Sequence, residues 1–311
     1  MKKYKLAIIL YGNPDQYPVN LQQYADLKKS LNDFEVFYYD FNRKEQEKFL
    51  NDWGNSKFDI VLKNSYGRGN ENYIERVLEK NKIPFIGSDS KSTLIGTSKH
   101  DSKELFKKQN IPVLPDVYLT KGSWKNNFDK LMQDINALGF PLIVKASAGT
   151  DSRGLVLVSN EEKLIAAIDS VLQNYKDLIV EKYLEDPYEV TCLVIDVDDP
   201  KALEPIGIIN KGFVPADTKD QGKLHIELPA KLSFEMISKV QKIAIQTHRA
   251  LECRSFSRTD ILIQDNLPYV LETDVHPGFR LASPTTKCLE RAGINLNDLF
   301  LDLTKKILRK D

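Results

Sequence analysis

Residues 258–284 read RTDILIQDNLPYVLETDVHPGFRLASP and contain two apolar runs with interspersed polar residues. Short runs of this kind, rich in β-branched and aromatic residues, predict two β-strands. The tetrapeptide QDNL at 264–267 separates them and is typical of a hairpin turn. We therefore expect an antiparallel hairpin whose turn is centred near Asn266.

Three carboxylates lie on this predicted hairpin. With the turn near Asn266, Asp260 pairs with Glu272 and Arg258 pairs with Asp274. Because side chains alternate between the two faces of a strand, all four project from one face. Clustered carboxylates repel each other unless a cation neutralises them, and two Mg²⁺ ions bridging nucleotide phosphates would account for three acids. The alternative is a solvent-exposed hairpin whose acids are only hydrated.

The rest of the chain alternates between strand and helix patterns. Apolar runs predict strands at 4–10, 35–40, 58–62, 83–87, 116–120, 140–147, 155–158, 178–184, 188–197 and 203–209. Amphipathic spacing predicts helices at 21–31, 72–82, 100–109, 124–138, 161–173, 233–251 and from about 296. This order predicts an α/β fold, α+β in its last part, with domains at 1–95, 96–185 and 186–311.

Composition narrows the class of protein. The chain has 311 residues, with 44 Lys and Arg against 44 Asp and Glu. A net charge of zero argues against non-specific electrostatic binding to nucleic acid. The three cysteines form no CxxC pair, which favours buried thiols in a reducing compartment. Neither a secretory signal nor a long apolar span is visible, so we expect a soluble cytoplasmic protein that does not cross a membrane.

Two further segments carry charges at the ends of predicted strands. Lys145 ends PLIVK and precedes the small-residue loop ASAGTDSRG, which could cradle phosphate or form an ordinary turn. Glu181 and Lys182 end the strand LIVEKYL and could contact a nucleotide base, although an ordinary strand end has the same pattern. His276 lies near the acids and is either a ligand or a turn residue before Pro277.

Taken in order, these segments resemble the ATP-grasp superfamily, and most closely its D-alanine–D-alanine ligase branch. YGRGNEN, IPFIGS and SKHDSKELFKKQNIPVLP resemble that family's HGxxGEDG, PYTGS and MDKxxxK segments. GFPLIVKAS resembles its lysine-bearing strand, LIVEKYLEDPYEVT its adenine-binding segment, and RTD…ETDVHPGF its metal site. The resemblance covers nearly the whole chain and implies an ATP-grasp fold with the nucleotide between the central and C-terminal subdomains.

The resemblance also implies roles for individual residues. The ATP-binding set would be Lys99, Lys145, Ser152, Glu181, Lys182, Tyr183, Leu184 and Glu189. The metal ligands, for two Mg²⁺ or alternatively Mn²⁺, would be Asp260, Glu272 and Asp274, the last where the family usually has Asn. Arg258 would stabilise the oxyanion of the tetrahedral intermediate, and Lys219 would close over the γ-phosphate.

The predicted substrate pocket departs from the family pattern. Gln16 stands where the family has a Glu that anchors the first D-alanine, and Asp151 and Asp220 replace that residue's Ser and Tyr partners. Ser283 matches a residue that binds the second substrate's carboxylate. Arg280 has no family counterpart and could bind an acidic or carboxylate-bearing substrate.

These differences predict an ADP-forming ligase that joins amino acids or similar acids and amines, but not two D-alanines. One alternative is a true D-alanine–D-alanine ligase. A non-catalytic nucleotide-binding protein is an alternative of another class. Relatives are often dimers, so a homodimer is a further expectation.

Overall fold

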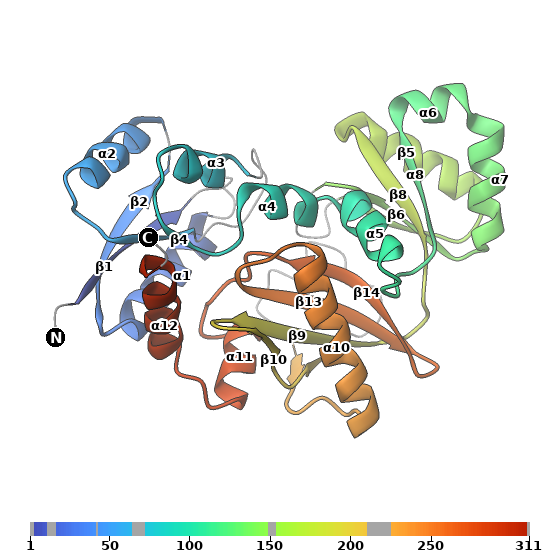
Figure 1. The fold of residues 1–311 in the computed structure, drawn as a ribbon. Coiled ribbons are helices and arrows are strands. Elements are labelled where there is room, and N and C mark those ends of the chain that lie inside the picture. Colours follow the sequence, from blue (N-terminus) through green and yellow to red (C-terminus); the bar gives the residue numbers. More distant parts are fainter. Residues whose placement is uncertain are drawn as a thin grey trace.

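The computed structural model describes residues 3–10, 17–41, 43–63, 72–148, 154–209 and 225–309. Its strands form three separate sheets, one in each third of the chain (Figure 1). Each sheet lies within one of the three predicted ranges, while the exact boundaries at residues 95 and 185 stay predictions.

The first sheet is parallel and has helices on both faces. Its elements are β1 (Tyr4–Leu10), α1 (Tyr17–Ser30), β2 (Phe34–Asp40), α2 (Arg43–Gly54), β3 (Ile60–Lys63), α3 (Tyr73–Lys80) and β4 (Phe85–Ile86). The strand order is β2-β1-β3-β4, which confirms the predicted parallel unit. Leu6 and Ile8 face one core and Ala7 and Ile9 face the other, as alternation along a strand requires.

The C-terminal helix belongs to the core of this first unit. Helix α12 (Leu296–Leu308) packs Phe300 and Leu303 into the same cluster as Leu6 and Ile8. Figure 1 shows α12 beside α1, with the two chain ends on the same side of the molecule. The last helix therefore ties the third part of the chain to the first.

Two helices link the first unit to the second sheet (Figure 1). The elements here are α4 (Ser90–Thr97), α5 (Lys99–Lys108), β5 (Asp116–Thr120), α6 (Lys121–Asn126), α7 (Phe128–Leu138), β6 (Leu142–Ala146), β7 (Leu155–Val158), α8 (Glu161–Asn174) and β8 (Asp177–Lys182). The antiparallel order is β5-β8-β6-β7. One face packs Leu142, Val144 and Val180 against α7 and α8, which leaves Lys145 and Glu181 on the opposite face.

The third sheet is antiparallel throughout and carries the predicted hairpin. Its elements are β9 (Tyr188–Asp196), β10 (Pro200–Ala202), β11 (Ile206–Ile209), β12 (His225–Glu227), α10 (Phe234–Ala250), β13 (Ser255–Gln264), β14 (Leu267–Asp274) and α11 (Pro284–Arg291). The order is β12-β11-β9-β13-β14, with β10 on β9. One face buries Val190, Cys192 and Ile261 under α10, so the polar hairpin residues lie on the other face.

Several predicted elements differ from the structure. The predicted helix at 124–138 is two helices, because Asn127 caps both α6 and α7 with a non-helical backbone. Helices α2, α4 and α11 and strands β10 and β12 were not predicted. The charged α2 sequence RKEQEKFLNDWG offers few apolar positions, yet Phe49 is fully buried. Within the described ranges, no helix combines the length and apolar character needed to cross a bilayer.

Candidate functional site

The β13–β14 hairpin pairs its charged residues as predicted, although the register changes at a β-bulge between Asp260 and Ile261, beyond which Ile261 pairs with Val270. Arg258 pairs with Asp274 and Asp260 pairs with Glu272. The turn at Asp265 and Asn266 has positive φ angles of 51° and 61°, which Asn and Asp adopt more readily than most residues. The four charged side chains share one face, while Thr259 and Thr273 pair on the other face and are buried.

Arginine and lysine side chains neutralise the three acids within the protein. Arg258 donates to both oxygens of Asp260, with Nε–Oδ1 at 3.2 Å and Nη2–Oδ2 at 3.3 Å. Its Nη2 also lies 3.8 Å from Oδ2 of Asp274. Burial raises the pKa of Asp274, and the Arg258 charge opposes that rise only in part. Thr191 on β9 donates to Asp260 Oδ1 and holds that carboxylate from the neighbouring strand.

Lys99 brings the start of α5 to this face. Its Nζ lies 3.7 Å from Oε2 of Glu272, and its backbone N–H donates to Ser147 O at 2.8 Å. Ser98 also forms a β-bridge with Ala148, just after β6. The segment that follows Lys145 is therefore joined to the helix whose first residue reaches the hairpin acids.

Lys145 and Glu181 form a buried ion pair on the second sheet. Lys145 pairs with Ile179 across the ladder, which makes Glu181 its diagonal neighbour. The distance from Lys145 Nζ to Glu181 Oε1 is 2.7 Å, and both side chains are buried. Lys103 on α5 donates to the other carboxylate oxygen of Glu181 and to Leu114 O at 2.9 Å.

This network fixes the charge of Glu181. Burial alone would raise the Glu181 pKa, but the Lys145 and Lys103 ammonium groups hold it below its usual value. Lys103 also lies 3.1 Å from Asp116 Oδ1, and Lys107 lies 2.9 Å from the same oxygen. Glu181 is thus an ionised carboxylate that orients Lys145, a contact that its predicted adenine role did not include.

The other predicted nucleotide residues lie around the end of β8 and on β9. Lys182 Nζ donates to Gly139 O at 2.9 Å, and the Tyr183 N–H donates to Pro141 O at 3.2 Å. Leu184 is half-buried. Glu189 pairs with Leu262, which places it on the same face as Asp260 two residues away.

The predicted substrate residues have different surroundings. Ser283 is buried, donates to Gly278 O at 2.9 Å and caps the N-terminus of α11, so its hydroxyl has a structural role. Arg280 is exposed. Five predicted residues lie outside the described ranges, namely Gln16, Asp151, Ser152, Lys219 and Asp220.

Two residues contact the site acids and were not predicted from the sequence, namely Lys103 and Thr191. Lys103 lies one helical turn after Lys99 in SKHDSK, and that spacing is the signal that places both on one face of α5. Thr191 had no such signal, because its partner Asp260 is on another strand.

The donor set fits a hard cation only if other oxygens take part. Among the residues that the structure describes, no three His, Cys, Asp or Glu side chains are grouped so as to hold a metal by themselves. Mg²⁺ usually takes one or two carboxylates and completes its shell with phosphate or water oxygens. Asp260 and Glu272, opposite each other on one face, meet that requirement.

Comparisons with known proteins identify the family of this chain. Residues 105–305 match the family described as D-ala D-ala ligase C-terminus. A D-alanine–D-alanine ligase of Bacillus anthracis is 30% identical over 258 residues, which cover 81% of this chain and 82% of the relative. One of Flavobacterium johnsoniae is 28% identical over 95% of this chain and 96% of its own length.

A solved structure shows the same fold over the full length. The crystal structure of D-alanine–D-alanine ligase from Bacillus anthracis complexed with ATP superposes with a TM-score of 0.82 and 26% identity. The alignment covers 99% of this chain and 98% of that chain. The chain therefore belongs to the D-alanine–D-alanine ligase family, has the ATP-grasp fold, and is an ATP-dependent, ADP-forming ligase of carbon–nitrogen bonds.

Proposed function

We propose that this ligase joins two amino-acid-like substrates through an acylphosphate. The observation that carries the proposal is the convergence of Lys99, Arg258 and the hairpin acids on one face, next to the segment that follows Lys145. Phosphoryl transfer needs positioned cations around the transferred group rather than a reactive protein side chain. An arrangement of fixed lysines, an arginine and carboxylates suits that requirement.

The proposed reaction has two steps. The carboxylate of the first substrate attacks the γ-phosphorus of ATP, which forms an acylphosphate and releases ADP. The amine of the second substrate then attacks the acyl carbon, loses a proton, forms the amide and expels phosphate. Lys99 and Lys145 would bind phosphate oxygens, and Arg258 would face the negative oxygen of the tetrahedral intermediate.

A divalent metal fits the hairpin face. Asp260, Glu272 and Asp274 would hold Mg²⁺, which would neutralise negative charge on the phosphates. Arg258 and Lys99 contact the same acids. We expect metal binding to draw Glu272 away from Lys99, because Glu272 is nearly half exposed and its oxygen lies 3.7 Å from the Lys99 ammonium.

Two substrate pairs have separate support. The replacements at Gln16, Asp151 and Asp220 favour a first substrate other than D-alanine, because an amide binds an ammonium less strongly than a carboxylate does. The two curated relatives named above are D-alanine–D-alanine ligases, and they favour two D-alanines at least as strongly. The class of reaction is the same in both cases.

The test is ADP release from ATP and Mg²⁺ across a matrix of D- and L-amino acids, with product masses measured. D-Alanyl-D-alanine formation would establish the second pair, and turnover with another pair would establish a changed pocket. ATP binding without turnover on any pair would contradict the proposal.

A matched pair of variants tests the hairpin face. Asp260→Asn removes a predicted metal ligand, and we expect kcat/KM to fall about a hundredfold or more. Asp265→Asn makes the same change in the turn of the same hairpin, where Asn tolerates the positive φ of 51°, and should behave as wild type. Equal activities for the two variants would rule out the proposed role of Asp260.

A further inference from the structure

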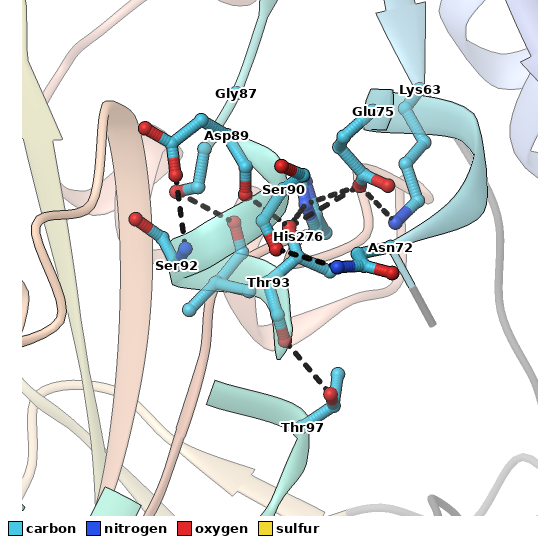
Figure 2. Close-up of polar contacts among 12 residues, drawn as sticks. Lys63, Asn72, Glu75, Gly87, Asp89, Ser90, Ser92, Thr93, Thr97 and His276 are labelled. Atoms are coloured by element: carbon cyan, nitrogen blue, oxygen red, sulfur yellow. Dashed lines mark hydrogen bonds and ion pairs between the residues drawn. The ribbon is translucent and has the colours of Figure 1, made fainter. Parts of the chain in front are cut away.

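A buried polar cluster joins the first unit to the end of β14. Of its members, only His276 was considered from the sequence, as a ligand or a turn residue. Figure 2 shows its members converging from different elements. Lys63 ends β3, Glu75 is on α3, Thr93 is on α4, and His276 follows β14 by two residues. Glu75 and His276 are thus far apart in the sequence and adjacent in space.

Glu75 is at the centre of the cluster and is fully buried. Its Oε1 accepts from Lys63 Nζ and lies 2.9 Å from His276 Nε2 and 3.3 Å from Thr93 Oγ1. Burial alone would raise the pKa of Glu75, but His276 and Lys63 lower it to about 2, so the carboxylate is ionised. Its Oε2 is buried and has no hydrogen-bond partner among the described residues. Within the described part of the chain, the contacts of this carboxylate are therefore made through one oxygen.

The His276 ring is held in one orientation. Ionised Glu75 can only accept, so the proton is on His276 Nε2. Thr93 Oγ1 lies 2.9 Å from the same nitrogen. A Cβ on Gly87 would come within 3.2 Å of Cε1 and Nδ1 of the ring, and the Gly87 φ of +117° disfavours any other residue. The ring is therefore enclosed by the carboxylate, the hydroxyl and the glycine backbone.

His276 connects this cluster to the hairpin acids. Its backbone N–H donates to Oδ1 of Asp274 at 2.9 Å, while Oδ2 of Asp274 faces Arg258. The residue whose side chain is anchored on the first unit thus also orients the last acid through its main chain. We propose that Glu75 and His276 are positioning residues that hold Asp274 in the orientation required for metal–nucleotide binding. This inference rests on the metal role in the proposed function.

A contact that only held the first and third parts of the chain together would not need a buried, charged pair such as Glu75 and His276. Asn297 on α12 donates to Asp33 at 2.7 Å and accepts from the Asp33 N–H at 3.0 Å, and it joins the same two parts of the chain without reaching the acids. Apolar packing would serve as well as a buried ion pair for cohesion alone. The buried charge of Glu75 is explained if its role is to hold the His276 side chain in one orientation.

The experiment measures Mn²⁺ binding to the full chain with a non-hydrolysable ATP analogue, by the electron paramagnetic resonance signal of free Mn²⁺. His276→Leu removes the donor to Glu75, and we expect the Kd for Mn²⁺ to rise about tenfold, as for other residues that orient metal ligands. His276→Gln can place an amide N–H at the former Nε2 position and should restore most of the affinity. Glu75→Gln should also raise the Kd for Mn²⁺. It replaces His276→Leu as the test if that variant does not fold.

Asn297→Ala is the matched control, because it breaks the other contact between the same parts of the chain. Wild-type Kd in Asn297→Ala with the loss and rescue at His276 would support the inference. Unchanged affinity in both His276→Leu and Glu75→Gln would overturn it, and so would an equal loss in Asn297→Ala. Failure of the wild type to bind Mn²⁺ with the analogue would instead refute the metal role in the proposed function, and the inference with it.

ADP release provides a second readout on the same variants. Misplacement of Asp274 should lower kcat at saturating Mg²⁺ and ATP, whereas partial unfolding would lower the amount of active enzyme and leave the Mg²⁺ dependence unchanged. We expect the Mg²⁺ concentration for half-maximal ADP release to shift in His276→Leu and to return to the wild-type value in His276→Gln.

Discussion

Replacing Glu75 with Gln is expected to reduce the acid sensitivity of the free energy of unfolding. The Glu75 pKa is about 2 in the folded chain against an ordinary 4.5. Since the folded pKa is the lower one, Glu75 adds stability above pH 4.5 that is lost as the pH falls towards 2. The difference between the two values corresponds to about 3 kcal/mol in total. Between pH 7 and pH 3 the loss works out at about 2 kcal/mol.

The assay is urea unfolding of the metal-free wild type and Glu75→Gln at pH 7, 5 and 3. Other carboxylates titrate in both proteins, so the difference between the two pH profiles isolates Glu75 and the partners coupled to it. Wild type should lose about 2 kcal/mol more than the variant by pH 3. Glu290→Gln removes an exposed ion pair with Lys287 and should change the profile by less than about 1 kcal/mol. Parallel profiles for wild type and Glu75→Gln would refute the reasoning.

Three further results are expected. Gly87→Ala should destabilise the fold by about 1–3 kcal/mol in thermal unfolding, since φ is +117° and His276 is 3.2 Å from the added Cβ. Gly293→Ala, at φ +68° with open space around it, should cost only about 1 kcal/mol, and equal losses would contradict the contact argument. Glu181→Gln should destabilise the chain by about 3–5 kcal/mol in urea, because it leaves buried lysines without a full counter-charge; a neutral effect would mean that their charge is compensated elsewhere. Burial raises the pKa of all three cysteine thiols, so they should react with a thiol reagent at pH 8 only after unfolding, and prompt labelling of the native protein would contradict their burial.

Most strands and helices were predictable from local sequence patterns, namely alternation along strands and amphipathic spacing along helices. The two strands and the Asp265–Asn266 turn were predictable because both are short-range features. The turn alone would place Asp260 opposite Leu271, and a β-bulge between Asp260 and Ile261 restores its pairing with Glu272. Helix α2 was not predictable from periodicity because its exposed positions are strongly charged and Phe49 alone supplies a fully buried aromatic anchor. Its helical state depends on packing against the first sheet.

The sequence by itself determined the α/β architecture, most of the strands and helices, and the two strands that carry the three acids. Only the tertiary structure decided which charges compensate one another. Glu181 proved to be the partner of Lys145 and Lys103, and Glu75 the partner of His276 from the opposite end of the chain. Lys145 and Glu181 lie on adjacent strands of one sheet, Lys103 reaches Glu181 from helix α5, and Glu75 and His276 come from different units. An ion pair between residues so far apart in the sequence leaves no periodic trace in it.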